Sequence, residues 1–250
     1  MAEYKQLGKI KLIICQDRQE VVRIAAEIFT KAIRKKPDIV LGLATGETPI
    51  GMYKELIQIH KEEGLDFSRV KTFNLDEYAE LSDDHPQSYR YFMDKNLFNH
   101  IRIDRSNTYI PDGKREDFQS SCQEYEDKIK RAGGIDLQLL GIGSNGHIGF
   151  NEPGSTVDSR TRVVDLAEST IKDNARFFQN KSEVPKKAVT VGIGTILEAK
   201  RIVLLATGRN KVEAVAKAVK GKISSDIPAS FLQNHPDCTF IVDKDAAIDL

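Results

Sequence analysis

The amino-acid sequence predicts an α/β fold, in which a single-domain, doubly wound, mostly parallel sheet carries helices on both faces and a lid segment. Short runs rich in Ile, Val and Leu alternate along the chain with longer segments in which apolar residues recur at helical spacing. The 250 residues suffice for a well-buried core and include no repeat, low-complexity tract or Pro/Gly-rich linker. We therefore expect one domain over residues 1–250.

The individual elements follow from these two patterns. The apolar runs show little polar alternation, which is typical of strands covered on both faces. They predict strands at residues 11–15, 38–43, 70–75, 136–141, 188–193, 201–206 and 238–242. In the first helical segment, residues 20–35, Val21 and Ile24 begin an apolar stripe at helical spacing. The same pattern predicts helices at residues 49–63, 87–99, 118–132 and 211–220.

Residues 151–187 form the longest stretch without a clear strand. The stretch opens with Asn-Glu-Pro-Gly and is charged around residues 171–178. Loops of this length are uncommon in compact domains and often close over a site, so we expect a candidate lid within 151–187. A surface excursion with one or two helices is the alternative.

Composition and charge exclude several classes of protein. Lys and Arg together number 37, as do Asp and Glu, and the basic residues form no run, so a nucleic-acid partner is not expected. The N-terminus lacks an apolar core of signal-peptide length, and no stretch approaches the length of a membrane span. The three cysteines are odd in number and widely spaced, as in a cytoplasmic protein with reduced thiols. We therefore expect a cytoplasmic protein that binds neither nucleic acid nor a membrane.

Four loops carry the residue types that do chemistry, and each follows a predicted strand. They are residues 44–49, 74–78, 143–152 and 207–211. In open parallel sheets, ligands bind at the carboxyl ends of the strands, where loops lead into helices. We therefore expect the four loops to converge on one crevice.

The first and fourth loops have the composition of a phosphate site. In the first, Gly46 permits close approach of the backbone, Thr45 and Thr48 add hydroxyl groups, and the helix start offers unpaired N–H groups. In the fourth, Lys211 lies at a helix start, where a bound anion offsets its unfavourable interaction with the helix dipole. An ordinary capped turn and a solvated lysine are the alternatives.

The second loop holds two adjacent carboxyl groups, Asp76 and Glu77. Asp76 could face the crevice and act as a general base that takes a proton from the carbon next to a carbonyl. The alternative is that Asp76 or Glu77 caps the next helix or faces solvent.

In the third loop, which lies within residues 141–154, His147 is flanked by the four glycines at positions 141, 143, 146 and 149. Histidine can both take and give a proton near neutral pH, and Glu152 could orient this one. The loop also fits the Gly-x-Gly-x-x-Gly spacing of a dinucleotide site, but it lies far from the first strand and leads into no clear helix. A metal site lacks a second nearby histidine.

Together these motifs resemble the glucosamine-6-phosphate deaminase family, also described as glucosamine/galactosamine-6-phosphate isomerases. The matching segments are LGLATGETPIGMY, TFNLDEY, HPQSYRYFM, LLGIGSNGHIGFNEPG, SRTRVVDL, NARFF and KAVTVGIGT, in family order over nearly the whole chain. The resemblance implies an enzyme that converts glucosamine 6-phosphate and water to fructose 6-phosphate and ammonia. It implies no metal, nucleotide or redox cofactor.

Carried over position by position, the resemblance also implies roles for the site residues. Asp76 is implied as the base that acts at C2 of the sugar, and His147 as the residue that opens the pyranose ring with help from Glu152. The implied phosphate ligands are Thr45, Gly46, Thr48, Arg176 and Lys211. Arg176 falls within the candidate lid, which suits a bidentate phosphate contact made on closure.

Two departures from the family pattern bear on catalysis and regulation. Asn145 stands where many members have Asp in a catalytic Asp–His–Glu relay, so the relay in this chain would run through Glu152 alone. The allosterically regulated branch has a lysine two residues after the arginine that matches Arg162, and a longer C-terminal tail, whereas this chain has Val164. The resemblance is therefore to the short, non-allosteric bacterial type, for which we expect a monomer or small homo-oligomer.

Two other functions compete with deamination. The 6-phosphogluconolactonases are hydrolases that share the fold and the glycine–histidine loop, but they do not usually continue it as His-Ile-Gly-Phe-Asn-Glu-Pro. A non-catalytic sugar-phosphate sensor needs no base at Asp76 and typically carries a DNA-binding appendage, which this chain lacks. In every case the expected ligand is a small sugar phosphate.

Overall fold

The computed structural model describes residues 2–115, 117–175, 178, 180 and 183–250. Within this part of the chain, the central sheet is built from β1 Glu3–Leu7, β2 Ile10–Cys15, β3 Val40–Leu43, β4 Lys71–Asn74, β6 Thr108–Tyr109, β7 Leu137–Leu140, β10 Ile202–Ala206 and β11 Cys238–Asp243. The strand order is β1-β2-β11-β10-β7-β3-β4-β6, and neighbouring strands are parallel except in the β1–β2 hairpin. The predicted mostly parallel sheet is thus confirmed.

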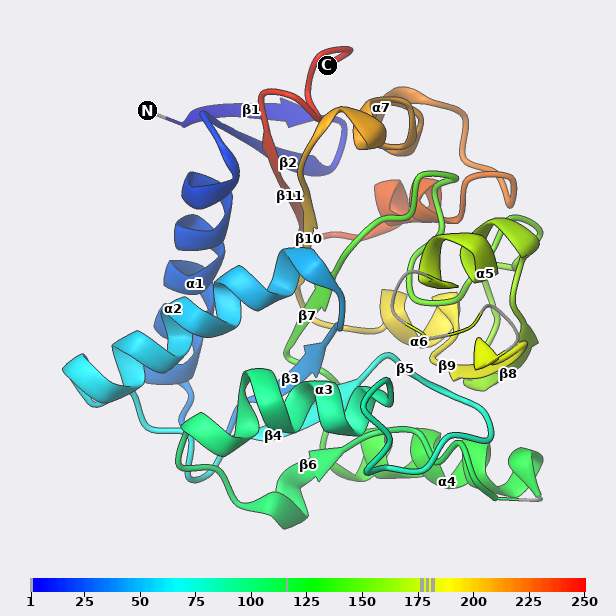
Figure 1. Ribbon diagram of the computed structural model, residues 1–250. Coiled ribbons are helices and arrows are strands. Elements are labelled where there is room, and N and C mark those ends of the chain that lie inside the picture. Colours follow the sequence, from blue (N-terminus) through cyan, green and yellow to red (C-terminus); the bar gives the residue numbers. More distant parts are fainter. Residues whose placement is uncertain (1, 116, 176–177, 179, 181–182) are drawn as a thin grey trace.

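Helices cover both faces of this sheet. They are α1 Arg18–Lys35, α2 Glu47–Glu63, α3 Tyr89–Asn96, α4 Phe118–Arg131, α5 Glu168–Asn174, α6 Ile193–Leu197 and α7 Val212–Lys220. Figure 1 shows α1 and α2 on one side of the sheet and α6 and α7 on the other. Local sequence sets the helix ends: Asp17 accepts the Glu20 N–H at 2.9 Å before α1, and Gly64 ends α2 at φ 69°.

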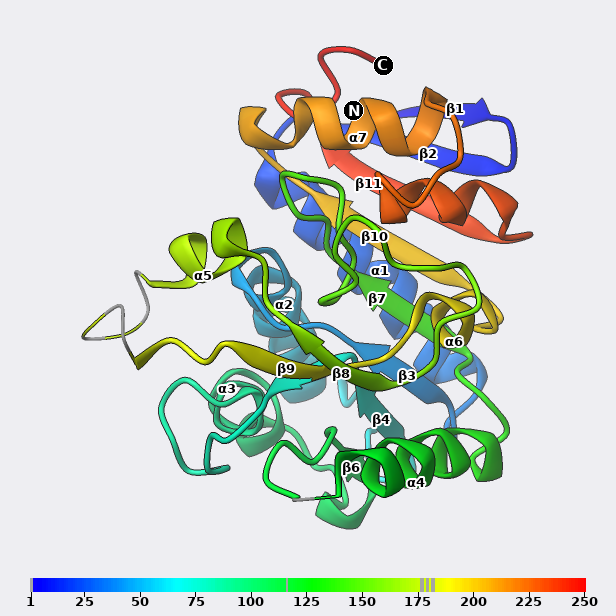
Figure 2. The same ribbon diagram turned by 90° about the vertical axis from the view of Figure 1, so that its right-hand side faces the viewer.

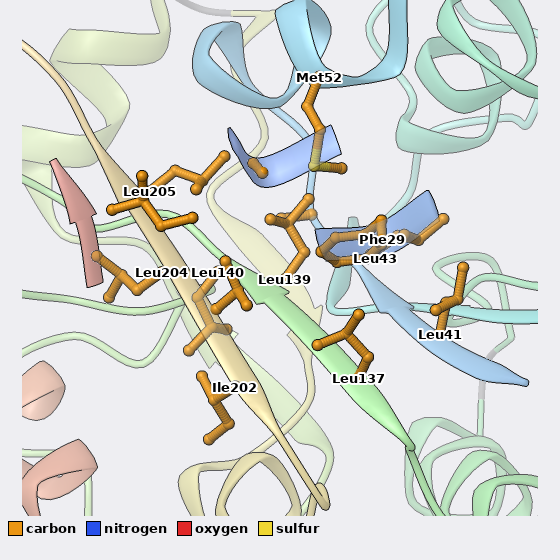
Figure 3. Close-up of a cluster of buried hydrophobic side chains, with 14 of the residues drawn as sticks. Phe29, Leu41, Leu43, Met52, Leu137, Leu139, Leu140, Ile202, Leu204 and Leu205 are labelled. Carbon is orange, nitrogen blue, oxygen red and sulfur yellow. The ribbon is translucent and has the colours of Figure 1, made fainter. Parts of the chain in front are cut away.

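The core lies between the central strands and the helices. β3, β7 and β10 are buried along their whole lengths, as their continuous apolar runs predict. Figure 3 shows Phe29 of α1 and Met52 of α2 beside the leucines of these strands, and both side chains are completely buried. This packing gives the loops at the strand ends a rigid base.

The direction in which the chain crosses the sheet reverses between β3 and β7, which are neighbours. After β3, the next strand of the central sheet is β4, which lies toward the β6 edge. After β7, the next strand of this sheet is β10, which lies toward the β1 edge. Such a switch point opens a crevice outside the carboxyl ends of the two strands, where open α/β sheets bind ligands. The first and third of the predicted loops flank it.

A second, three-stranded antiparallel sheet corrects two predictions. It consists of β5 Asp76–Tyr78, β8 Arg162–Asp165 and β9 Lys187–Thr190, in the order β5-β9-β8 (Figure 2). The prediction that residues 188–193 extend the parallel sheet is wrong, because β9 pairs antiparallel with both β5 and β8. The stretch 151–187 also contains a strand, β8, which no apolar run marks because its side chains are half-buried or exposed.

Other differences concern short elements. The predicted helix at 87–99 is split into α3 and a separate 3₁₀ turn, Phe98–His100. The edge strands β1 and β6 were not expected from the sequence, since β1 is almost wholly exposed and β6 has two residues. Helix α5 lies within the candidate lid segment. Along the described chain, none of the helices has the length and apolar character that a membrane span requires.

Candidate active site

A cavity of about 560 Å³ lies at the carboxyl ends of the central strands. All four of the loops singled out in the sequence contribute to its wall, which includes Thr45, Gly46, Thr48, Asp76, His147 and Lys211. Asn145 and Glu152 lie behind His147 and contact it. Arg176, the remaining predicted site residue, lies outside the described residues.

Asp76 and Glu77 serve different purposes, because successive side chains of β5 point to opposite sides. Asp76 lines the cavity and is 6% exposed. The Glu77 carboxylate accepts the backbone N–H groups of Tyr89 at 2.8 Å and Arg90 at 3.0 Å, and so caps the start of α3. The helix-capping alternative therefore describes Glu77, and Asp76 is the carboxyl group that faces the cavity.

The surroundings of Asp76 favour its protonated form. Burial, followed by the negative charge of Glu77, raises the pKa of the Asp76 carboxyl to about 8. Gly149, with φ +58°, keeps the space beside it open, because a Cβ there would lie 3.4 Å from Asp76 Oδ2 and 3.0 Å from Thr190 Oγ1. A carboxyl group poised near neutral pH is suited to take a proton and return it.

His147 is held in one orientation by its own loop. Its Nδ1 lies 2.7 Å from Asn145 Oδ1, and its ring packs over Gly143, where a Cβ would come within 2.3 Å of Cε1. The Asn145 side-chain NH₂ group donates to Glu152 Oε2 at 2.8 Å, which turns the amide oxygen toward the histidine. Nδ1 must therefore carry the proton, which leaves Nε2 of the neutral ring as the acceptor.

Glu152 is the charged end of this relay. Its Oε2 lies 3.4 Å from His147 Nδ1, and its Oε1 accepts the hydroxyl of Thr170. Burial alone raises the pKa of Glu152, but hydrogen bonding and charge from His147, with hydrogen bonds from Thr170 and Asn145, outweigh burial and lower it to about 2. Glu152 is thus ionised near neutral pH and able to stabilise an imidazolium.

Another part of the cavity lining, at the turns before α2 and α7, has the features of a phosphate site. Gly46 (φ +102°) and Gly208 (φ +89°) make sharp turns that a side chain would strain, immediately before α2 and before the 3₁₀ turn that leads into α7. Lys211 supplies a cation to the lining. Asp243 fixes the Gly208 loop, because its carboxylate accepts the Gly208 N–H at 3.0 Å.

The cavity is also lined by residues that were not identified as site residues from the sequence, among them Arg18, Tyr89 and Thr170. Arg18, at the start of α1, donates to the Glu47 carbonyl at 2.7 Å. Tyr89 stacks on Phe150 with 6.1 Å between ring centroids, and Thr170 projects from α5. Only Tyr89 falls in a segment that the family resemblance covered; nothing local in the sequence marks the other two.

Arg162 lies outside the cavity and supports the histidine loop. Its guanidinium donates to Asn151 Oδ1 at 2.9 Å and to Ser155 Oγ at 3.1 Å. Asn151 in turn donates to the carbonyl groups of Ile148 and Val191, each at 2.9 Å.

Among the described residues, no three His, Cys, Asp or Glu side chains come together as a group that could bind a metal ion. A separate hollow of about 900 Å³ lies beside α4, where Glu126 accepts the hydroxyl groups of Thr161 and Thr195. Glu126 therefore links α4 to Thr161 and to Thr195 of α6.

Comparison with known proteins identifies the family. Residues 18–241 match the family model described as glucosamine-6-phosphate isomerases/6-phosphogluconolactonase. A glucosamine-6-phosphate deaminase of Thermoanaerobacter pseudethanolicus is 56% identical over 238 residues, which are 95% of this chain and 94% of the relative. One of Clostridium perfringens strain 13 is 53% identical over 95% of this chain and 98% of the relative.

Solved structures agree with this assignment. A monomeric glucosamine-6-phosphate deaminase superimposes with a TM-score of 0.93 at 50% identity, over 95% of this chain and 98% of that one. The 6-phosphogluconolactonase of Trypanosoma cruzi, at 23% identity and a TM-score of 0.75 over 98% of each chain, shares the fold alone. The resemblance drawn from the sequence motifs is confirmed, and the chain belongs to the glucosamine-6-phosphate isomerase/6-phosphogluconolactonase family.

Proposed function

We propose that this protein is a glucosamine-6-phosphate deaminase, which converts glucosamine 6-phosphate and water to fructose 6-phosphate and ammonia. The observation that carries the proposal is the pairing, in one cavity, of a buried carboxyl group with a histidine whose Nε2 is free to accept a proton. The two groups suit the two proton transfers that an amino sugar needs for ring opening and isomerisation. Deaminases with more than 50% identity to this chain support the same reaction.

The first step opens the pyranose ring. His147 relays the proton of the C1 hydroxyl to the ring oxygen, the C1–O5 bond breaks, and a C1 aldehyde forms. Asn145 holds the imidazole in the Nδ1–H tautomer, and Glu152 stabilises the positive charge while the ring carries the extra proton. All three residues therefore act in ring opening.

The second step acts at C2. Asp76 removes the C2 proton, which gives an enolamine, and reprotonation at C1 leaves an imine at C2. Water adds to this imine, ammonia leaves, and fructose 6-phosphate remains. These transfers use positioned side chains and water and need no cofactor.

The phosphate of the substrate binds at the turns that precede α2 and α7. We assign it to the N–H groups at the Gly46 turn, the hydroxyl groups of Thr45 and Thr48, and the cation of Lys211. We further assign Arg176, on the strength of the family resemblance. The 50% identical deaminase is monomeric, and on that ground we propose that this protein acts as a monomer or small homo-oligomer. We also propose a cytoplasmic location, because the three cysteines are buried and unpaired.

One experiment separates this function from its competitors. The protein is incubated with glucosamine 6-phosphate, and ammonia and ketose phosphate are measured together; a parallel sample receives 6-phosphogluconolactone and is assayed for its hydrolysis. Equal amounts of the two products are expected. Hydrolysis of 6-phosphogluconolactone without ammonia release would indicate the lactonase, and binding without any turnover would indicate the sensor.

A further inference from the structure

The Glu152 carboxylate accepts a hydrogen bond from the hydroxyl group of Thr170, a residue of α5 that lies outside the histidine loop. We propose that Thr170 is a positioning residue, whose hydroxyl fixes Glu152, and through Glu152 the Asn145 amide and the tautomer of His147. The inference rests on the proposed function and deepens it, because it names the residue of α5 that keeps the ring-opening histidine ready.

Both oxygens of the Glu152 carboxylate are engaged. Oε2 accepts from Asn145 Nδ2 at 2.8 Å, and Oε1 accepts from Thr170 Oγ1. The terminal torsion of a glutamate is broad, so a hydrogen bond to one oxygen alone does not fix the plane of the carboxylate. Thr170 is 6% exposed, so bulk water has little access to take the place of its hydroxyl. The plane of the carboxylate thus depends on Thr170.

The orientation of Glu152 decides which histidine nitrogen is protonated. An ionised carboxylate only accepts hydrogen bonds, so the Asn145 NH₂ group must face it and the amide oxygen must face His147 Nδ1. If the carboxylate turns away, the amide can flip and present its NH₂ group to Nδ1. The proton then moves to Nε2, and the imidazole loses the acceptor that faces the sugar.

Thr170 also connects the Glu152–Asn145–His147 relay to the small sheet that carries Asp76. Helix α5 follows β8, which pairs with β9, and β9 pairs with β5, where Asp76 lies. No side chain caps the N-terminus of α5 at Ala167, so tertiary contacts have to hold the helix. The Thr170 hydroxyl is such a contact, and it ties α5 to the histidine loop.

The first test reads the tautomer directly and needs no turnover. Protein labelled with ¹⁵N-histidine is compared by NMR, near neutral pH, for the parent, Thr170→Val and Thr170→Ser. The parent and Thr170→Ser should show the Nδ1–H form of His147, and Thr170→Val a mixture of both tautomers, with His60 and His235 unchanged as internal references. A pure Nδ1–H signal in Thr170→Val overturns the proposal. If the valine variant does not fold, Thr170→Ala makes the same test.

The second test separates positioning from anchoring of α5. Loss of a hydrogen bond to a charged group should lower kcat for glucosamine 6-phosphate by roughly tenfold to hundredfold in Thr170→Val. Binding of 2-amino-2-deoxyhexitol 6-phosphate, an open-chain probe that needs no ring opening, should stay within about twofold, and Thr170→Ser should recover most of kcat. A parental kcat, or a loss of probe binding as large as the loss of kcat, overturns the proposal.

A matched control is available on the same chain. Thr161 is 7% exposed and donates to the Glu126 carboxylate at 2.5 Å, outside the cavity. Thr161→Val should therefore lower stability as Thr170→Val does but leave kcat and the His147 tautomer unchanged. If Thr161→Val alters both as strongly, the effect is a general loss of buried hydrogen bonds and the positioning role is contradicted. A parent protein that releases no ammonia contradicts the proposed function instead, and the tautomer result remains a separate test.

Discussion

At the scale of single residues, the neighbours Asp76 and Glu77 show what sequence reasoning could and could not decide. The strand end and the pair of acids were evident from the sequence, as were both possible roles. The assignment of the two roles was not, because it depends on where α3 begins relative to β5, twelve residues earlier. The structure directs Glu77 to the α3 amides and Asp76 to the cavity.

The pH dependence of the reaction should report Asp76. Because the pKa of this carboxyl is raised to about 8, the basic form is lost as pH falls, and kcat/KM should rise with pH and level off above about 8. Glu77→Gln removes the like charge and lowers the pKa of Asp76, so the rise of kcat/KM should shift to lower pH. Titration of the substrate is common to both proteins and cancels in the comparison. Superimposable pH profiles for parent and variant would contradict the assignment.

Gly143 should matter through the histidine. A Cβ at this position would meet Cε1, Nδ1 and Nε2 of His147 at 2.3–2.6 Å, so the imidazole must move. We expect Gly143→Ala to lower kcat at least about tenfold, since the ring is displaced from its tautomer-setting contact. In a His147→Gln background the same substitution should add little further loss. Additive losses would mean that Gly143 acts independently of the histidine.

At the scale of elements, the local sequence pattern predicted which segments are strands more accurately than it predicted which strands pair with each other. The apolar run of β9 is buried, yet its partners are the short strands β5 and β8 rather than the central sheet. Burial makes a segment apolar whichever sheet covers it, so the run could not reveal the second sheet. Thr170 escaped notice for a related reason, since its contact with Glu152 is set by tertiary packing of α5.

The loop before α7 should bind the substrate phosphate. Lys211→Ala should raise KM for glucosamine 6-phosphate tenfold or more, because charge-assisted bonds to phosphate contribute roughly 1.5–3 kcal/mol. The effect on unphosphorylated glucosamine should be small, and Arg176→Ala should act in the same direction. Lys217→Ala is a suitable control, since this lysine of α7 pairs with Glu213 and does not line the cavity. Unchanged discrimination between the two sugars in Lys211→Ala would move the phosphate elsewhere.

At the scale of the whole molecule, the position of the site followed from the order of strands and helices. Buried strands alternating with helices imply a doubly wound sheet, and such a sheet has its crevice at a switch point. The four predicted loops meet there. The same reasoning did not predict the structure of the candidate lid segment, because the position of β8 and α5 depends on contacts between residues far apart in the sequence.

Regulation is also a property of the whole molecule, and we expect hyperbolic kinetics without activation by N-acetylglucosamine 6-phosphate. Val164 packs against the apolar cluster around Tyr78 and Phe150, and Arg162 is engaged by Asn151 and Ser155. Without the lysine of the regulated branch, an effector loses on the order of 1.5–3 kcal/mol, as much as a typical allosteric coupling energy of about 1–3 kcal/mol. Saturation curves with and without the acetylated sugar check this. A sigmoidal curve that the effector makes hyperbolic would contradict it.

The central claim is that Asp76 removes the C2 proton, and the most direct measurement follows that proton. Glucosamine 6-phosphate deuterated at C2 is incubated with the parent and with Asp76→Asn, and loss of deuterium from C2 is followed together with ammonia. Asp76→Asn should slow both by ~10²–10⁴ or more, because an amide cannot accept the proton, while the open-chain hexitol phosphate still binds. Loss of C2 deuterium at the parental rate in Asp76→Asn would show that another group is the base.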